Sequence, residues 1–201
     1  MSLEQLKLRG KIFLLEAFDL FAFLIFVTGI VLFVRFFIFN PYTVVGQSME
    51  PVFSEGDFII VDKVSPRLGT FQRGDVIVFV PQGKDVPYIK RVIGLPGEIV
   101  RIHENRVYIC DWDQALEECM MLDEEAYTME NAETSSERCK KDEFIIDDIW
   151  LFVLGDNRWF STDSLCCFGL WCYEWANFLV YPQDIIGKVA VRLFPQVTTF
   201  W

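Results

Sequence analysis

The chain has 201 residues, which suits one globular domain with an anchor, or two small subdomains. Hydrophobic residues make up 52% of it, with 20 Phe, and the mean hydropathy is +0.28, which is unusually apolar for a soluble protein. The formal net charge is -11 and no basic stripe runs along the sequence, so nucleic acid is excluded as a predicted partner.

The amino-terminal region predicts a membrane anchor. Residues 1–11 carry three basic residues against one acidic residue, and residues 12–39 are apolar except for three charges, with none at 20–34. A helix over 12–39 is long enough for the ~30 Å hydrocarbon layer. No Ala-x-Ala cleavage site follows Arg35, so we expect a retained anchor with a cytoplasmic amino terminus. A buried core helix is the alternative.

After Asn40-Pro41 the pattern changes to short apolar runs separated by glycine and proline, which is typical of an antiparallel sandwich-like or barrel-like β domain. We assign this domain to residues 40–110 and 144–201. A hairpin is predicted around His103, which we interpret as a turn residue. The predicted strands are 42–45, 58–61, 76–80, 88–92, 99–102, 107–110, 144–154 and 184–193.

Residues 111–143 form an acidic insert. Between Asp111 and Asp148 there are 14 acidic and 3 basic residues, so this stretch holds the whole charge excess. We predict a solvated surface lobe. A calcium site is the alternative, but no spaced Asp-x-Asp-x-Asp loop with its glycine is present, and we expect no metal.

The six cysteines show no paired Cys-x-x-Cys spacing that would hold zinc. Outside the cytoplasm some of them would form disulfides, with fifteen complete pairings open, and buried free thiols are the alternative. They are Cys110, Cys119, Cys139, Cys166, Cys167 and Cys172.

A possible nucleophile lies just beyond the anchor, in Gly46-Gln47-Ser48-Met49-Glu50-Pro51. A glycine two residues before a serine leaves amide N–H groups free to face an oxygen. The single histidine lies in a turn, so the candidate base is Lys90, on an alternating strand with apolar neighbours. Burial there would have to lower its pKa by roughly two to three units, at ~3 to 4 kcal/mol. Serine–lysine dyads are an established variant of serine–histidine catalysis.

Four ordered blocks together resemble type I signal peptidases: residues 46–51, 56–63, 88–98 and 155–169. The resemblance covers about 35–169, with a weaker echo at 184–191. It implies that Ser48 is the nucleophile and Lys90 the general base. It also implies a mainly β catalytic domain of the signal-peptidase type behind one transmembrane helix.

The resemblance assigns further roles around this dyad. Ser161 would orient the lysine amine and Asp163 would support that loop, although both are also typical turn residues that cap a local backbone. Asp156 and Arg158 would be structural. The backbone N–H of Ser48 would bind the oxyanion, and the oxyanion and substrate pocket would be formed by Gly46, Gln47 and Met49.

Two departures from the family pattern are visible. Leu165 stands where the family often has an arginine, so Asp163 needs either another basic partner or hydrogen bonds alone. A segment rich in cysteine and tryptophan, 166–181, is longer than the usual link. It is either a loop resting on the membrane or an extra packed flap.

By this resemblance the chain cleaves N-terminal signal peptides from translocated preproteins at the external face of the plasma or inner membrane. Its expected partners are preprotein signal peptides, the lipid bilayer and the secretion translocon, and it needs no cofactor. A catalytically impaired, membrane-tethered β domain that serves as a binding or scaffold protein is the alternative. Signal peptidases of the endoplasmic reticulum type would need histidine at Lys90, and self-cleaving repressors lack an anchor.

Overall fold

A computed structural model describes residues 3–68, 71–112, 114–137, 139, 141–147, 149–169 and 178–200; of residues 3–12 and 68 it describes the backbone alone. The chain divides into two compact units, Met1–Phe39 and Asn40–Trp201, and each is described by itself.

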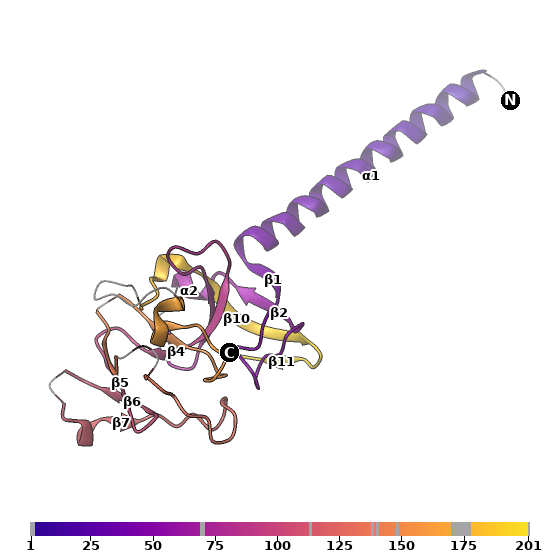
Figure 1. Ribbon diagram of the computed structural model, residues 1–201. Coiled ribbons are helices and arrows are strands. Elements are labelled where there is room, and N and C mark those ends of the chain that lie inside the picture. The colour runs from indigo at the N-terminus through magenta and orange to yellow at the C-terminus, as the bar shows by residue number, and fades with distance from the viewer. Residues whose placement is uncertain are drawn as a thin grey trace. The chain divides into compact units, whose positions relative to one another are not determined.

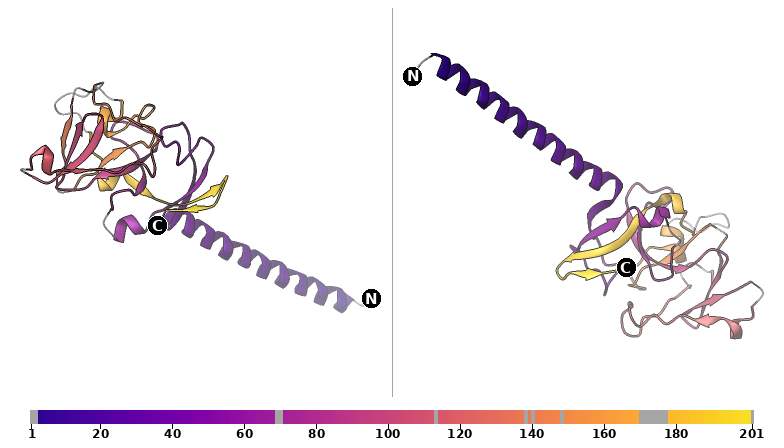
Figure 2. Two further views of the ribbon diagram at one scale, coloured as in Figure 1. Left: turned by 90° about the horizontal axis from the view of Figure 1, so that it is seen from below. Right: turned by 180° about the vertical axis from the view of Figure 1, so that it is seen from behind.

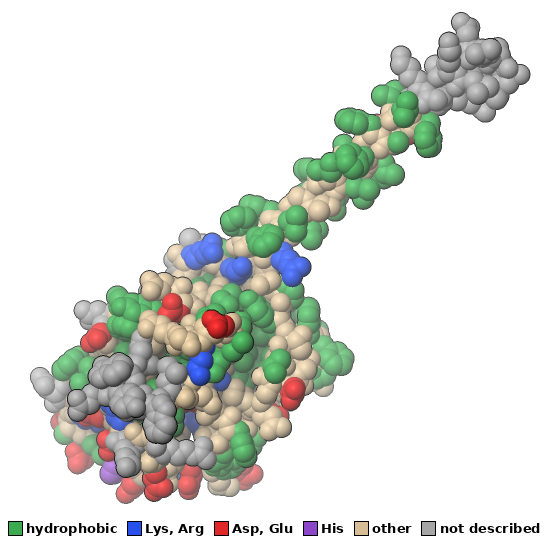
Figure 3. Space-filling view, turned by 45° about the horizontal axis from the view of Figure 1, so that its top comes forward, with side chains coloured by type: hydrophobic (Ala, Val, Ile, Leu, Met, Phe, Trp, Pro, Cys, Tyr) green, Lys and Arg blue, Asp and Glu red, His purple; other side chains and the backbone are tan. Residues whose placement is uncertain are grey.

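The first unit is a single helix, α1 (Leu3–Phe37). Its stretch Phe13–Phe37 is long and apolar enough to cross a membrane, and none of that stretch is buried. At 1.5 Å per residue, these 25 residues reach about 37 Å. Figure 3 shows hydrophobic side chains along the described part of the helix. The predicted apolar helix is confirmed; it ends two residues early because Asn40, which precedes Pro41, takes an extended conformation.

The second unit contains two antiparallel sheets (Figure 1). Within the described residues, the larger sheet has the order β1-β2-β10-β3-β4-β9, with β11 beside β10. Figure 2 shows β10 and β11 as neighbouring arrows. The strands of this sheet are β1 (Phe39–Thr43), β2 (Phe58–Asp62), β3 (Val76–Phe79), β4 (Tyr88–Gly94), β9 (Phe152–Leu154), β10 (Ile185–Phe194) and β11 (Thr198–Thr199).

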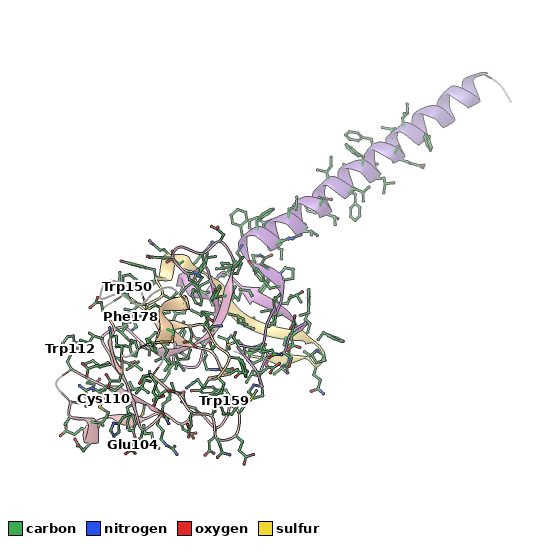
Figure 4. All side chains as sticks on the ribbon, in the orientation of Figure 1. Glu104, Cys110, Trp112, Trp150, Trp159 and Phe178 are labelled. Carbon is green, nitrogen blue, oxygen red and sulfur yellow. A yellow bond between two sulfur atoms is a disulfide. The ribbon has the colours of Figure 1, made fainter. Side chains whose placement is uncertain are left out.

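The smaller sheet has the order β7-β6-β5-β8 in the described part of the chain. The predicted hairpin is confirmed: Ile99 pairs with Cys110 and His103 with Arg106. Glu104 and Asn105 form its two-residue turn with φ of 48° and 61°, the geometry that favours tight hairpins, and Glu104 lies at the tip (Figure 4). The strands are β5 (Ile99–His103), β6 (Arg106–Cys110), β7 (Met120–Met121) and β8 (Glu143–Ile145).

Short helical turns complete the described elements. One is the α-helical turn α2 (Ser65–Leu68), and three are 3-10 turns: η1 (Leu116–Glu118), η2 (Ser164–Gly169) and η3 (Pro182–Asp184).

The stretch 144–154 does resume the sheet structure, but it holds two short strands, β8 and β9, that belong to different sheets. The chain leaves the smaller sheet after β8, turns at Trp150, whose N–H donates to the Asp147 carbonyl (3.2 Å), and enters the larger sheet as β9. This crossing brings the rings of Phe144 and Phe152 into contact, with centroids 4.8 Å apart and planes tilted by 46°. Both belong to a core shared by the two sheets, which is the sandwich-like packing that the sequence indicates.

The acidic insert packs against the smaller sheet. β7 pairs with β6 at the sheet edge, and the Thr134 N–H donates to the Asn105 carbonyl (2.9 Å). Two disulfides hold the insert, Cys110–Cys119 and Cys139–Cys166. The expectation that some of the cysteines form disulfides is confirmed, and the alternative of buried free thiols finds no example among the described residues. Residues 170–177, the middle half of the predicted flap or membrane loop at 166–181, lie outside the described residues.

Candidate active site

Ser48 lies in the loop between β1 and β2. Gly46 has φ +86°, a left-handed backbone that glycine adopts without a steric penalty. Beyond Ser48 the loop closes in a turn in which the Phe53 N–H donates to the Met49 carbonyl (2.8 Å), and both of these side chains are fully buried. The core therefore holds the loop in place while Ser48 stays at its surface.

Lys90 comes from β4, which lies between β3 and β9 in the larger sheet. Its Nζ is 2.6 Å from Ser48 Oγ and donates a second hydrogen bond to the Ile89 carbonyl (2.7 Å). Only 3% of Lys90 is exposed. The two residues are 42 positions apart in sequence, and the structure brings the predicted pair into direct contact.

The environment of Lys90 changes its acidity. Burial lowers the pKa of Lys90 from 10.5 to about 8, while the carboxylates of Asp163 and Asp156 partly oppose this by favouring the ammonium form. Burial penalises the charged amine because the protein interior solvates it less well than water does. At pH 7.4, about a fifth of the molecules therefore carry a neutral Lys90 that can accept a proton.

The turn after β9 supports the nucleophile loop through Asn157. Its backbone N–H donates to the Ser48 carbonyl and its side-chain amide to the Gln47 carbonyl, both at 3.1 Å. In the described part of the chain the Ser48 N–H has no acceptor, so it is available to bind an oxyanion. Gly155 is required here, because a Cβ atom would overlap the Ser48 carbonyl oxygen and Ser161 Oγ.

Asp163 holds the same turn from its other side. Its carboxylate accepts hydrogen bonds from the N–H groups of Gly155 (2.9 Å) and Leu165 (3.1 Å), and the residue is 5% exposed. Of the two arrangements left open by Leu165, the structure contains the hydrogen-bonded one.

The hydroxyl oxygen of Ser161 is buried beside Gly155 and has no hydrogen-bond partner among the described residues. The same residues include no hydrogen bond from Ser161 to Lys90, whose amine bonds Ser48 and Ile89 instead. The role of Ser161 in orienting the lysine amine therefore stays a prediction.

Asp156 and Arg158 both form buried ion pairs. Asp156 accepts two hydrogen bonds from Arg91, at 2.8 and 2.7 Å, and burial raises its pKa although Arg91 opposes this. Arg158 pairs with Glu124 of the acidic insert, and its Nε donates to the Gly155 carbonyl (3.0 Å).

Three residues of this network had no role in the sequence prediction. Asn157 and Arg91 stand inside the quoted motifs, beside Asp156 and Lys90, so their positions were a usable signal. Glu124 is one of many acids in the insert, and nothing in the sequence marks it.

A cavity of about 580 Å³ opens beside the dyad. Residues 42–48 line one part of it and residues 86–90 another, together with Ile59, Val78, Phe160 and Thr162. Gly46 and Gln47 line the cavity, and their role in binding substrate stays a prediction. Met49 does not line the cavity: its side chain packs in the core below the loop with Phe53, so the expected pocket role of Met49 has no support.

The described residues contain no group of three or more His, Cys, Asp or Glu side chains that could hold a metal ion. At the site the structure brings together a hydroxyl, an amine with a lowered pKa and a backbone N–H group that has no acceptor among the described residues. This set can perform acyl transfer.

Comparison with known proteins gives consistent matches. A family model described as signal peptidase, peptidase S26, matches residues 17–194. Signal peptidase I of Bacillus licheniformis is 35% identical over 144 residues, which cover 69% of this chain and 73% of that protein. A probable signal peptidase I-1 of Synechocystis is 35% identical over 172 residues, with 82% and 76% covered. A crystal structure of a signal peptidase I from Enterococcus faecalis matches with 23% identity and a TM-score of 0.41, covering 60% of this chain and 97% of that chain.

Proposed function

The chain belongs to the signal peptidase family, peptidase S26, and from this premise we propose that it is a membrane-tethered serine endopeptidase with a Ser48–Lys90 dyad. Its substrates are translocated preproteins, from which it removes the N-terminal signal peptide. The observation that carries the proposal is the 2.6 Å separation between Lys90 Nζ and Ser48 Oγ, at a lysine whose pKa is lowered to about 8.

The dyad supports a two-step acyl transfer. Neutral Lys90 accepts the hydroxyl proton of Ser48, and the oxygen attacks the scissile carbonyl while the Ser48 N–H binds the oxyanion. The tetrahedral intermediate collapses, and Lys90 returns the proton to the amine of the departing mature protein. Water then attacks the acyl-enzyme and gives a proton to Lys90. Collapse of this second intermediate frees the signal peptide as a carboxylic acid and restores the Ser48 hydroxyl.

The cavity supports binding of an extended peptide. Residues 42–48 and 86–90 offer backbone groups along it, and the side chains of Val44, Ile59 and Val78 make it apolar. A segment lying along such backbone alternates its side chains between pocket and solvent. A preference for Ala-x-Ala is implied by the family resemblance alone.

The helix α1 supports tethering to the membrane. With basic residues before it and a large domain after it, we place the amino terminus in the cytoplasm and the catalytic domain on the external face of the plasma or inner membrane. The bilayer and the secretion translocon are the neighbouring partners. Confinement to one plane raises the effective concentration of enzyme and substrate.

The alternative, a catalytically impaired scaffold, has no observation in its favour. A scaffold gains nothing from a buried lysine beside a serine, because burying that amine costs about 3 kcal/mol of stability when it is charged.

The test is cleavage of a preprotein by the full chain in detergent, followed by mass measurement of the new amino terminus. Ser48→Ala and Lys90→Arg should each abolish cleavage, since arginine does not deprotonate at usable pH. Lys188→Arg is the matched control, because Lys188 forms a partly exposed ion pair with Asp75 and should tolerate the change. Full activity of Lys90→Arg would contradict the dyad.

A further inference from the structure

The loop that follows β9, residues 155–166, carries much of the supporting structure of the dyad. Asn157 holds the nucleophile loop, and Asp163 anchors the Gly155 N–H. The loop runs from the end of β9 at Leu154 into the first residues of the turn η2, so strand pairing holds little of it. Besides the backbone hydrogen bond from Asn157 to Ser48, side-chain contacts hold the loop, and two of these reach the acidic insert.

The first contact is the guanidinium of Arg158, whose side chain is 3% exposed. It donates to both carboxylate oxygens of Glu124, at 2.9 and 2.5 Å, and to the Thr134 hydroxyl. The same group donates to the Gly155 carbonyl. One buried cation therefore joins the start of the loop to two residues of the insert, and Glu124 raises the pKa of Arg158 by stabilising its charge.

Tyr127 reinforces this contact from within the insert. Its hydroxyl donates to Glu124 (3.0 Å), and its ring lies 4.4 Å from the guanidinium carbon of Arg91. Arg91 in turn holds Asp156, which lies inside the loop. The carboxylate of Glu124 is thus fixed by both Arg158 and Tyr127.

The second contact is the disulfide Cys139–Cys166, which joins the insert to the loop three residues beyond Asp163. Together, Glu124 and Cys139 fasten the loop near its two ends. The part between them contains Ser161 and Asp163.

The start of the loop determines where Ser48 lies. Gly155 packs so closely against the Ser48 carbonyl that no Cβ fits between them, and Asn157 bonds the carbonyls of Gln47 and Ser48. A shift of this turn would move the backbone of Ser48, and with it both the nucleophilic oxygen and the oxyanion-binding N–H. Displacements near 1 Å at a catalytic group cost about 10²-fold in rate.

We propose that the acidic insert is a clamp on loop 155–166, and that Glu124 is a positioning residue for Ser48, acting through Arg158. The inference rests on the proposed function. Without the Glu124 carboxylate, Arg158 would be a buried cation with no full counter-charge. Asp163, whose charge also stabilises Arg158, is the carboxylate it would then attract, which draws Asp163 away from Gly155.

The variant Glu124→Gln in the full chain tests this, with steady-state preprotein cleavage in detergent. We expect kcat to fall about tenfold to a hundredfold and KM to stay within about twofold, because no residue that lines the cavity changes. The control is Glu143→Gln, which makes the same charge change and frees Arg101 on β5 instead. It should keep the kcat of the wild type. A merely structural role would lower the melting temperature without this split between kcat and KM.

A second experiment removes the disulfide between the insert and the loop with the double variant Cys139→Ser, Cys166→Ser. This variant should also have a lower kcat. Wild-type kcat in Glu124→Gln, or an equal loss in Glu143→Gln, would overturn the proposal. If Glu124→Gln does not fold, unchanged kcat in the cysteine variant overturns it.

A separate readout distinguishes failure of the clamp from failure of the proposed function. Hydrogen exchange of residues 155–166 should accelerate in Glu124→Gln whether or not the wild type cleaves the preprotein, because the Gly155 and Asn157 amides lose their fixed acceptors. An inactive wild type would defeat the protease proposal, and unchanged exchange would defeat the clamp.

Discussion

When the pH is lowered, the enzyme should lose activity in proportion to the protonation of a single group, Lys90. With a pKa of about 8, the neutral fraction of Lys90 is roughly 0.9 at pH 9, 0.5 at pH 8 and 0.01 at pH 6. Because only the neutral amine accepts the Ser48 proton, activity rises with pH and then levels off. We therefore expect kcat/KM to fall about 50-fold between pH 8 and pH 6.

The assay is initial-rate cleavage of one preprotein between pH 5.5 and 9.5, at substrate well below KM, so that the profile reports the free enzyme. The substrate should lack ionisable side chains near its cleavage site. A flat profile between pH 6 and pH 9 would refute a lysine base. An activity that still rises about tenfold per pH unit up to pH 9.5, with no plateau, would refute the argument that burial lowers the pKa of Lys90.

The remaining predictions concern stability and packing. Lys90→Met removes an amine whose pKa is lower in the folded chain (about 8) than in the unfolded one (10.5). In that window the unfolded wild type binds more protons, so its free energy of unfolding should rise by about 3 kcal/mol relative to Lys90→Met between pH 8 and 10.5. Denaturant titrations followed by tryptophan fluorescence measure this, and parallel pH curves would contradict it. Gly155→Ala should lower kcat about a hundredfold, because the added Cβ displaces Ser161 or the Ser48 carbonyl. A wild-type kcat in this variant would contradict the prediction, because it would show that the loop adjusts to the Cβ without moving Ser48.

Local patterns carried much of the prediction. The β5–β6 hairpin follows from two alternating runs around a short polar turn, and the apolar helix from an unbroken hydrophobic segment. Both features depend on residues close in sequence, so a short stretch of sequence is enough to predict them. The pairing of Ser48 with Lys90 spans 42 positions and came from the family blocks, with the need for a base as its chemical reason.

Features set by distant contacts could not be read in this way. The break at Trp150, which sends β8 and β9 into different sheets, sits inside a stretch that looks uniformly strand-like. Met49 stands next to the nucleophile, yet its side chain turns into the core because the loop reverses there. No sequence motif around Glu124 indicates its role, because that role depends on an ion pair with Arg158, 34 positions away.

The cross-link between Cys139 and Cys166 also bears on how the protein matures. Thiols persist in the cytosol and are oxidised beyond it. If the catalytic domain has the external location proposed above, a newly made chain would cross the bilayer with both sulfurs reduced. The disulfide would then form only after translocation, on the side of the membrane where the preproteins are cleaved. Protein synthesised under reducing conditions should therefore insert into the membrane but cleave preprotein with a low kcat. Adding an oxidant afterwards should raise kcat to the wild-type value.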